Sequence, residues 1–250
     1  MYRVEDYPQI KNNFYLTTRN AGASKKLKGD VGIIVCLMMR RPTDFPEAEK
    51  AEFHKALCKA GSWLEAEAKK YGTYLKLRYY YFRINVPQDA DPRDGYKLMR
   101  DFFHRDSMDS IQEYYEERMK MDEMPFILVF DERARSFAME QFPTYNSRVD
   151  EISVVFRDYG GKFSWGTIAH ELLHQFGAND LYYPDAVEKC AKRYLKNSIM
   201  GIGGDRLDDL SAYLVGIKDT VSAESYYFLK ETMWMTKELY SKAVKEAWKK

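Results

Sequence analysis

The chain has few cysteines, almost no net charge and no long apolar run. Its three cysteines are widely spaced and form no Cys-x-x-Cys pair, which argues against a disulfide framework and against a cysteine-based zinc site. With 39 basic and 38 acidic residues the net charge is +1, so nothing indicates binding to nucleic acid or to an anionic membrane. The longest apolar run, at 31–39, has the length of one strand and is too short to cross a bilayer.

The first ten residues, MYRVEDYPQI, lack the apolar core of a secretion signal. The chain as numbered is therefore expected in the cytoplasm, or outside the cell if a leader was removed before residue 1. At 250 residues, 45% hydrophobic and 31% charged, it has the composition of a globular protein and the length of one sizeable domain.

Hydrophobic patterning predicts alternating strands and helices over the first two thirds of the chain. A first helix is expected from an Asp44 cap, with Pro46 in its first turn, to Gly72, and another begins after a Ser164 cap. No clear periodicity is visible from residue 181 to 205. The expected strands are 31–39, 74–86, 125–130, 135–141 and 150–157, and further helical segments are expected within 94–121 and over 223–248. This pattern predicts one α+β domain, α/β-like in its N-terminal part, with a mixed twisted sheet backed by helices.

Two of only four histidines lie four residues apart in the segment HELLHQFGAND, at 170–180. On a helix these positions share one side, about 6 Å apart, so the imidazoles of His170 and His174 can bind one metal ion. Glu171 can reach a water molecule on that ion and take its proton. Leu172 and Leu173 turn to other sides of the helix, where they can anchor it in the core. The alternative is a surface helix that carries two solvated histidines by chance.

The residues that follow fit a third ligand. Gly177 stands where a helix end favours a residue with positive φ, and it allows the chain to turn back toward the metal. Asp180 can then offer a carboxylate oxygen, although an Asx-turn is an alternative role for it. Three protein ligands with one open position are typical of a catalytic zinc site.

The segment resembles the metzincin zinc peptidases, whose pattern is HExxHxxGxxH/D. NSIMG, at 197–201, resembles their Met-turn and implies that Met200 forms a hydrophobic floor beneath the zinc. The resemblance implies an upper subdomain at 1–177, with the sheet and active-site helix, and a lower subdomain at 178–250, with the Met-turn and C-terminal helix. Residue-level similarity is confined to about 164–201.

Two positions depart from the common metzincin pattern. Asp180 replaces the usual third histidine, as in the snapalysin-like and immune-inhibitor-A-like branches, and an anionic ligand should make the zinc a weaker Lewis acid. Ile202 stands where many relatives have a tyrosine that stabilises the oxyanion. Candidate replacements are Tyr182, Tyr183 and Tyr213.

The predicted function is that of a zinc metallopeptidase, an endopeptidase that uses one Zn²⁺ ion. His170, His174 and Asp180 are the predicted ligands, and Glu171 is the general base. The partner is a peptide or protein substrate, which would lie extended along an edge strand formed by residues 135–141.

Four alternatives bear on this prediction. Another class of zinc peptidases takes its third ligand from a glutamate on a later helix, for which Glu188 and Glu224 are available. Peptide deformylases also use HExxH, but they need a cysteine ligand in an EGC-like segment, which the sequence lacks; Cys190 is the closest cysteine, in a segment typical of a helix face. A zinc-stabilised binding module would keep the ligands but have no use for Glu171, and a chance motif predicts no stoichiometric zinc.

Overall fold

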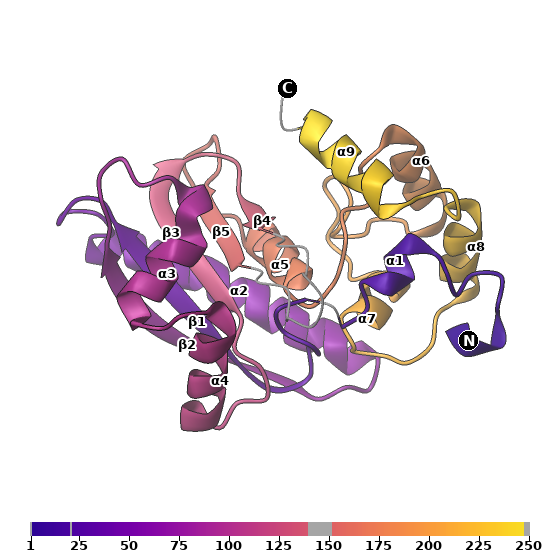
Figure 1. Ribbon diagram of the computed structural model, residues 1–250, viewed down its shortest axis with the longest axis horizontal. Coiled ribbons are helices and arrows are strands. Elements are labelled where there is room, and N and C mark those ends of the chain that lie inside the picture. The colour runs from indigo at the N-terminus through magenta and orange to yellow at the C-terminus, as the bar shows by residue number, and fades with distance from the viewer. Residues whose placement is uncertain (1, 21, 140–151, 248–250) are drawn as a thin grey trace.

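The computed structural model describes residues 2–20, 22–139 and 152–247, and the side chains of 139 and 247 lie outside the description. A five-stranded mixed sheet occupies one half of the molecule, and short helices gather in the other (Figure 1). This architecture confirms the α+β class.

The sheet has the strand order β2-β1-β3-β5-β4. Its strands are β1 (Gly29–Met39), β2 (Leu75–Asn85), β3 (Phe126–Arg133), β4 (Phe137–Met139) and β5 (Ile152–Arg157). β1 pairs in parallel with β2 and β3, and β3 pairs in parallel with β5. β4 alone is antiparallel, and it lies at the edge beside β5. The five strands predicted from the sequence are confirmed, with residues 140, 141, 150 and 151 of the last two outside the described ranges.

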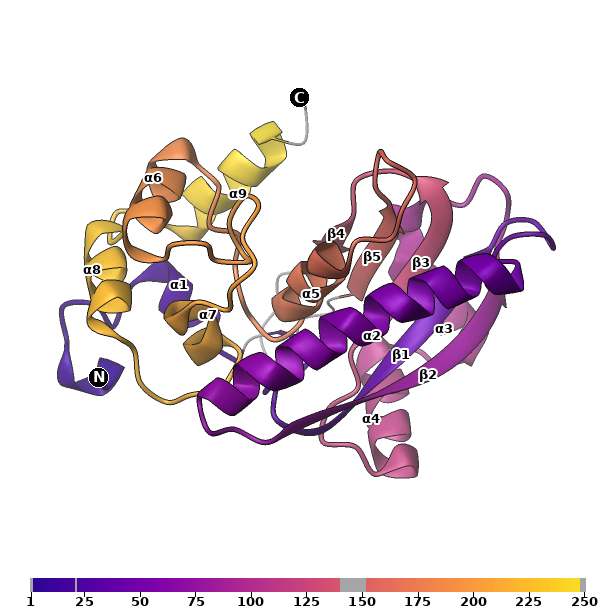
Figure 2. The ribbon, with the colours of Figure 1, turned by 180° about the vertical axis from the view of Figure 1, so that it is seen from behind.

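Helices cover both faces of the sheet. α2 (Glu47–Lys70) and α5 (Trp165–His174) lie on one face (Figure 2), and α3 (Gly95–Phe103) and α4 (Met108–Met119) lie on the other (Figure 1). Alternate residues of β1 divide between the two resulting cores: Val31, Ile33 and Val35 join the first, and Ile34 and Cys36 join the second. This double burial explains why the strand is a continuous apolar run in the sequence.

The second half of the molecule is helical. It contains α1 (Phe14–Thr17), α6 (Asp185–Tyr194), α7 (Asp209–Leu214), α8 (Ala223–Glu231) and α9 (Lys237–Ala247). The described chain also has two short 3-10 turns, η1 (Val4–Asp6) near the N-terminus and η2 (Pro92–Asp94) directly before α3. The N-terminal segment packs here, because Tyr2 pairs with Val221 and the amide of Asn13 donates to the Leu229 carbonyl at 2.6 Å. The first residues therefore lie with the C-terminal helices. The expected division of the chain at residue 177 places them in the sheet half instead.

The structure corrects one expected helix cap and divides another helical segment in two. Asp44 does not cap α2, whose N-cap is Pro46; its carboxylate instead accepts the backbone N–H groups of Arg40 and Arg41 at 3.0 and 2.9 Å. The segment 94–121 forms two helices, because the chain takes a left-handed conformation at His104 (φ 52°) and restarts at a Ser107 cap. Gly72, with φ 74°, follows the end of α2 as expected.

The C-terminal segment 223–248 was predicted as one helix, but it forms α8 and α9. The Thr232 hydroxyl donates to the Phe228 carbonyl at 2.8 Å and accepts the Asn13 amide at 3.1 Å. The Thr236 hydroxyl then accepts the backbone N–H of Leu239 at 3.3 Å, where α9 begins. The apolar spacing alone does not reveal such a break. Trp248 lies outside the described ranges.

α6 lies where the sequence shows no clear periodicity, apart from the helix-like face around Cys190, because its apolar side is small. The buried positions are Val187, Cys190 and Ala191, within a helix that is otherwise charged. Across the ranges given above, no helix has the length and apolar character that crossing a membrane requires.

Candidate metal centre

The local sequence fixes the helix that carries the motif. The Ser164 hydroxyl accepts the backbone N–H of Thr167 at 3.3 Å, which confirms it as the N-cap of α5. Leu172 and Leu173 are buried, as expected, and hold the helix in the core.

Gly177 turns the chain back from the end of α5. Its φ is 98°, and its N–H donates to the His174 carbonyl at 2.8 Å. A Cβ atom at this position would lie 2.1 Å from the Thr18 carbonyl oxygen, so the site requires glycine for both conformation and space. The turn returns the chain toward the histidines and brings Asp180 to them.

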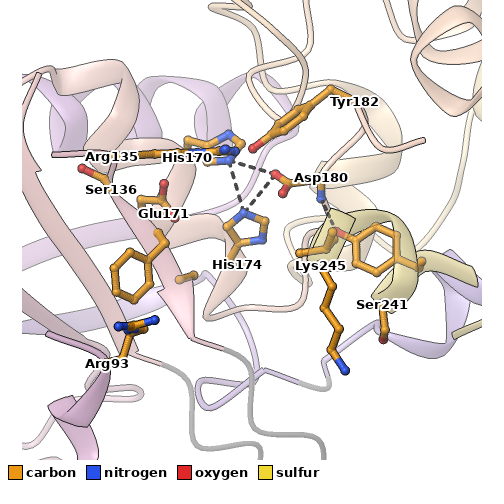
Figure 3. A pocket seen from close by; sticks show the side chains of 14 residues that line it. Arg93, Arg135, Ser136, His170, Glu171, His174, Asp180, Tyr182, Ser241 and Lys245 are labelled. Carbon is orange, nitrogen blue, oxygen red and sulfur yellow. Dashed lines mark hydrogen bonds and ion pairs between the residues drawn. The ribbon is translucent and has the colours of Figure 1, made fainter. Parts of the chain in front are cut away.

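Three predicted ligand atoms meet at one point (Figure 3). The Nε2 atoms of His170 and His174 are 3.2 Å apart, and the Oδ1 atom of Asp180 lies 3.0 Å from the first and 3.2 Å from the second. Glu171 is adjacent: one ligand atom from each of His170, Glu171 and His174 lies within 4.8 Å of the others. The residues that the sequence separates are thus brought together.

Backbone carbonyls orient both imidazoles. Nδ1 of His170 lies 2.8 Å from the Ile199 carbonyl oxygen, and Nδ1 of His174 lies 2.8 Å from that of Ala178. A carbonyl can only accept, so each Nδ1 carries the proton in these bonds. In the neutral rings both Nε2 lone pairs then face the centre, which is the tautomer that binds metals.

The donor set fits a divalent zinc ion. In the neutral tautomers, three acceptor atoms face one another with no hydrogen between them, and among the described residues Oδ1 of Asp180 is a buried atom without a hydrogen-bond partner. Such an arrangement calls for a cation. Ligands bonded at about 2.0–2.1 Å in a tetrahedron are about 3.3–3.4 Å apart. The observed separations of 3.0–3.2 Å are close to that spacing.

The electrostatics separate the roles of the two carboxylates. Burial would raise the pKa of Asp180, but the two imidazoles outweigh it and hold that pKa well below its ordinary value. Burial raises the pKa of Glu171 above its ordinary value, in spite of the neighbouring histidines. For His170, burial lowers the pKa, but the carboxylates of Asp180 and Glu171 outweigh it and raise the pKa overall. Asp180 is thus suited to hold a cation, and Glu171 to exchange a proton.

A cleft crosses the site and consists of two hollows. One has a volume of about 400 Å³ and lies between β4 and α9; the other, of about 720 Å³, continues past Tyr159 and the glycine-rich segment 201–204. Both are lined by the same central residues: Arg135, Ser136, His170, Glu171 and Tyr182. The candidate centre therefore opens in both directions along one cleft.

The three candidate oxyanion donors lie in different surroundings. The ring of Tyr182 stacks on His170 with centroids 6.0 Å apart, and its hydroxyl points toward the ligands (Figure 3). Burial raises the pKa of Tyr182, so its hydroxyl stays protonated. Tyr183 accepts a hydrogen bond from Arg135 at 2.7 Å and lines the larger hollow. Tyr213 is buried beneath the guanidinium of Arg19 and lines neither hollow.

The segment resembling a Met-turn touches the centre through its backbone. The Ile199 carbonyl orients His170, and the Met200 carbonyl accepts the backbone N–H of Leu181 at 2.9 Å. The Met200 side chain is fully buried in the larger core and does not line the cleft. Ile202 is 71% exposed at the rim of the larger hollow.

The rival ligands lie elsewhere. Glu188 lines the larger hollow but pairs with Lys192 at 2.6 Å. Glu224 lines neither hollow and is exposed in the first turn of α8. The Cys190 thiol lies 3.8 Å from a carboxylate oxygen of Glu231.

Sequence reasoning missed two residues that support the centre. The side-chain amide of Gln175 accepts the Phe126 N–H at 2.9 Å and donates to its carbonyl at 2.8 Å, joining α5 to β3. The hydroxyl of Tyr240, on α9, accepts the backbone N–H of Asp180 at 3.1 Å. Gln175 could have been recognised from the sequence, because it is a polar residue directly after the motif of an otherwise apolar helix. No local signal marks Tyr240.

The chain matches no protein-family model and no curated protein.

Proposed function

We propose that the chain is a zinc-dependent peptidase of the metzincin type. His170, His174 and Asp180 hold the ion, and Glu171 is the general base. One observation carries the proposal: two oriented imidazole nitrogens and an otherwise unpartnered carboxylate oxygen converge within 3.2 Å of one another, beside a second carboxylate. The position of this group in an open cleft favours a catalytic role over a structural one.

Glu171 accepts the proton of the attacking water and later delivers it to the leaving amine nitrogen. Its raised pKa suits both steps, because the group must gain and lose a proton near neutral pH. A bound zinc ion would lower the pKa of the water and polarise the scissile carbonyl. Tyr182 is the best-placed tyrosine to donate a hydrogen bond to the developing oxyanion, because its protonated hydroxyl points toward the ligands.

The edge of the sheet supports a peptide substrate. β4 pairs with β5 along one side, and no described strand pairs with its other side. Residues 135–138, the beginning of the segment predicted as the edge, line the cleft beside Glu171. An extended peptide can pair there through its main chain and present a carbonyl to the centre.

Replacing Glu171 with Gln tests the proposal. Zinc content, measured by elemental analysis, should stay near one ion per chain, because the three ligands are intact. Hydrolysis of a quenched peptide library should fall at least about 100-fold, since general base catalysis is lost. Glu224→Gln is the matched control and should change neither quantity.

Equal hydrolysis by Glu171→Gln and the parent would disprove the role of the base. Stoichiometric zinc without hydrolysis by any variant would instead favour a zinc-stabilised binding module. If Glu224→Gln loses zinc, the third ligand is a glutamate on a later helix.

A further inference from the structure

The two hollows of the cleft differ in charge. Apart from the central residues that both hollows share and the predicted ligands, the described residues that line the smaller hollow include two cationic side chains, Arg93 and Lys245, and no carboxylate. The described residues that line the larger hollow include three carboxylates, Asp158, Asp185 and Glu188, and no further cation. Arg93 and Lys245 lie on opposite walls, at the same end of the site (Figure 3).

Some of these charges are already paired. Arg93 binds Asp91 at 2.7 Å, and Glu188 binds Lys192 at 2.6 Å. Lys245, Asp158 and Asp185 are exposed and have no ion-pair partner among the described residues. These three side chains therefore contribute most to the difference between the hollows.

The segment 134–138, which leads from β3 into β4, runs along this charge gradient. Ala134 lines only the larger hollow, Arg135 and Ser136 line both, and Phe137 and Ala138 line only the smaller one. The chain thus passes from the acidic end to the basic end as its numbering rises. A substrate paired antiparallel to β4, the more stable pairing, would enter with its N-terminal part in the basic hollow.

We infer that the cleft selects peptides by a charge pattern across the scissile bond: acidic residues on its N-terminal side and basic residues on its C-terminal side. This inference rests on the proposed function. Acidic side chains would meet Lys245 and Arg93, and basic side chains would meet Asp185 and Glu188. A peptide of reversed polarity would place like charges together at both ends, so the pattern also rejects wrong substrates.

Two internally quenched peptides of one composition test this directly. One carries three Glu before and three Lys after an identical uncharged centre, and the other carries the blocks in reverse order. Zinc-loaded parent protein should cut the first with a kcat/KM about 10-fold higher at low salt, and the difference should shrink at about 0.5 M NaCl. Fluorescence anisotropy with zinc-loaded Glu171→Gln measures the affinities of both peptides without hydrolysis.

Substitutions that change a single charge test which hollow produces the preference for the first peptide. Lys245→Glu should reduce it several-fold, whereas Lys242→Glu, an exposed site on the same helix outside the cleft, should preserve it. Asp185→Asn should reduce it less, because only one charge is removed, and Glu224→Gln is its control in the first turn of α8.

The outcomes separate this inference from the proposed function. Equal kcat/KM and equal affinity for both peptides, or no binding of either, would overturn the charge inference. A preference for the reversed peptide would overturn the assigned orientation, and with it the pattern stated here. Selective binding of the first peptide without cleavage by the parent would support the charge pattern and refute peptidase activity.

Discussion

The ligands of the candidate centre come from two parts of the chain that are held in different ways. His170 and His174 lie on α5, which packs on the sheet and is tied to β3 through the Gln175 amide. Asp180 lies in a loop held by groups that are far away in the sequence. The Asn179 amide donates to the Thr18 hydroxyl at 2.6 Å, and the Asp180 N–H donates to Tyr240.

This difference indicates that the sheet half sets the positions of the two histidines, with the His170 ring oriented by the Ile199 carbonyl of the helical half, whereas the third ligand depends on the docking of the helical half. The loop lies between α5 and α6 and contacts segments near both ends of the chain. Metal binding should therefore link the two halves of the molecule, and changes on either side should affect it differently.

The largest expected effect is that of the metal itself. Zinc at about 1,000 times its Kd should raise the free energy of unfolding by about 4 kcal/mol, because the complete ligand set exists only in the folded chain. Urea unfolding with zinc and with a chelator measures this difference. His174→Ala and Asp180→Ala should each lose most of it. Full stabilisation of Asp180→Ala would show that the loop contributes no ligand.

Gly177→Ala disturbs the junction between the two parts. The new Cβ would meet the Thr18 carbonyl oxygen at 2.1 Å, in a backbone conformation with φ 98° that alanine resists. We expect a loss of about 3 kcal/mol in the free energy of unfolding. Gly203→Ala is the control, because its φ is also positive but nothing lies within 4 Å of the added atom. Equal losses in both variants would mean that the close approach to Thr18 does not matter.

Gln175→Leu weakens only the attachment of α5, the helix that carries the two histidines, to β3. It removes the amide partner of both Phe126 backbone groups while keeping similar bulk, and a buried unsatisfied group costs about 2 kcal/mol. Urea unfolding of the metal-free protein measures the loss. A stability equal to that of the parent would contradict the importance of this link.

The sheet and the histidine pair could be predicted because their signals are local. The doubly buried strand β1 is a continuous apolar run, and Ser164 and Gly177 mark the motif helix and its turn in the sequence. The spacing of the two histidines alone places them on one side of that helix. These features follow from period, capping and backbone conformation.

The helical half was harder to predict because tertiary contacts set its boundaries. α8 ends where Thr232 bonds to Asn13, more than two hundred residues earlier in the chain. Asp44 had the composition of a helix cap but folds back on the two residues that follow β1. No sequence pattern relates the hydroxyl of Tyr240 to Asp180, which lies 60 residues earlier in the chain.

Tyr240→Phe is the smallest of these changes and tests the loop side alone. It removes the hydroxyl that accepts the Asp180 N–H, while the ring keeps its packing against Phe14. We expect a loss of about 1 kcal/mol in stability and a zinc affinity about 10-fold lower, since the carboxylate is held less firmly. Competition with a fluorescent chelator measures the affinity. Tyr226→Phe, which removes a surface hydroxyl bonded to Gln9, should leave it unchanged. If Tyr240→Phe binds zinc as tightly as the parent, the position of Asp180 does not depend on its bond to α9.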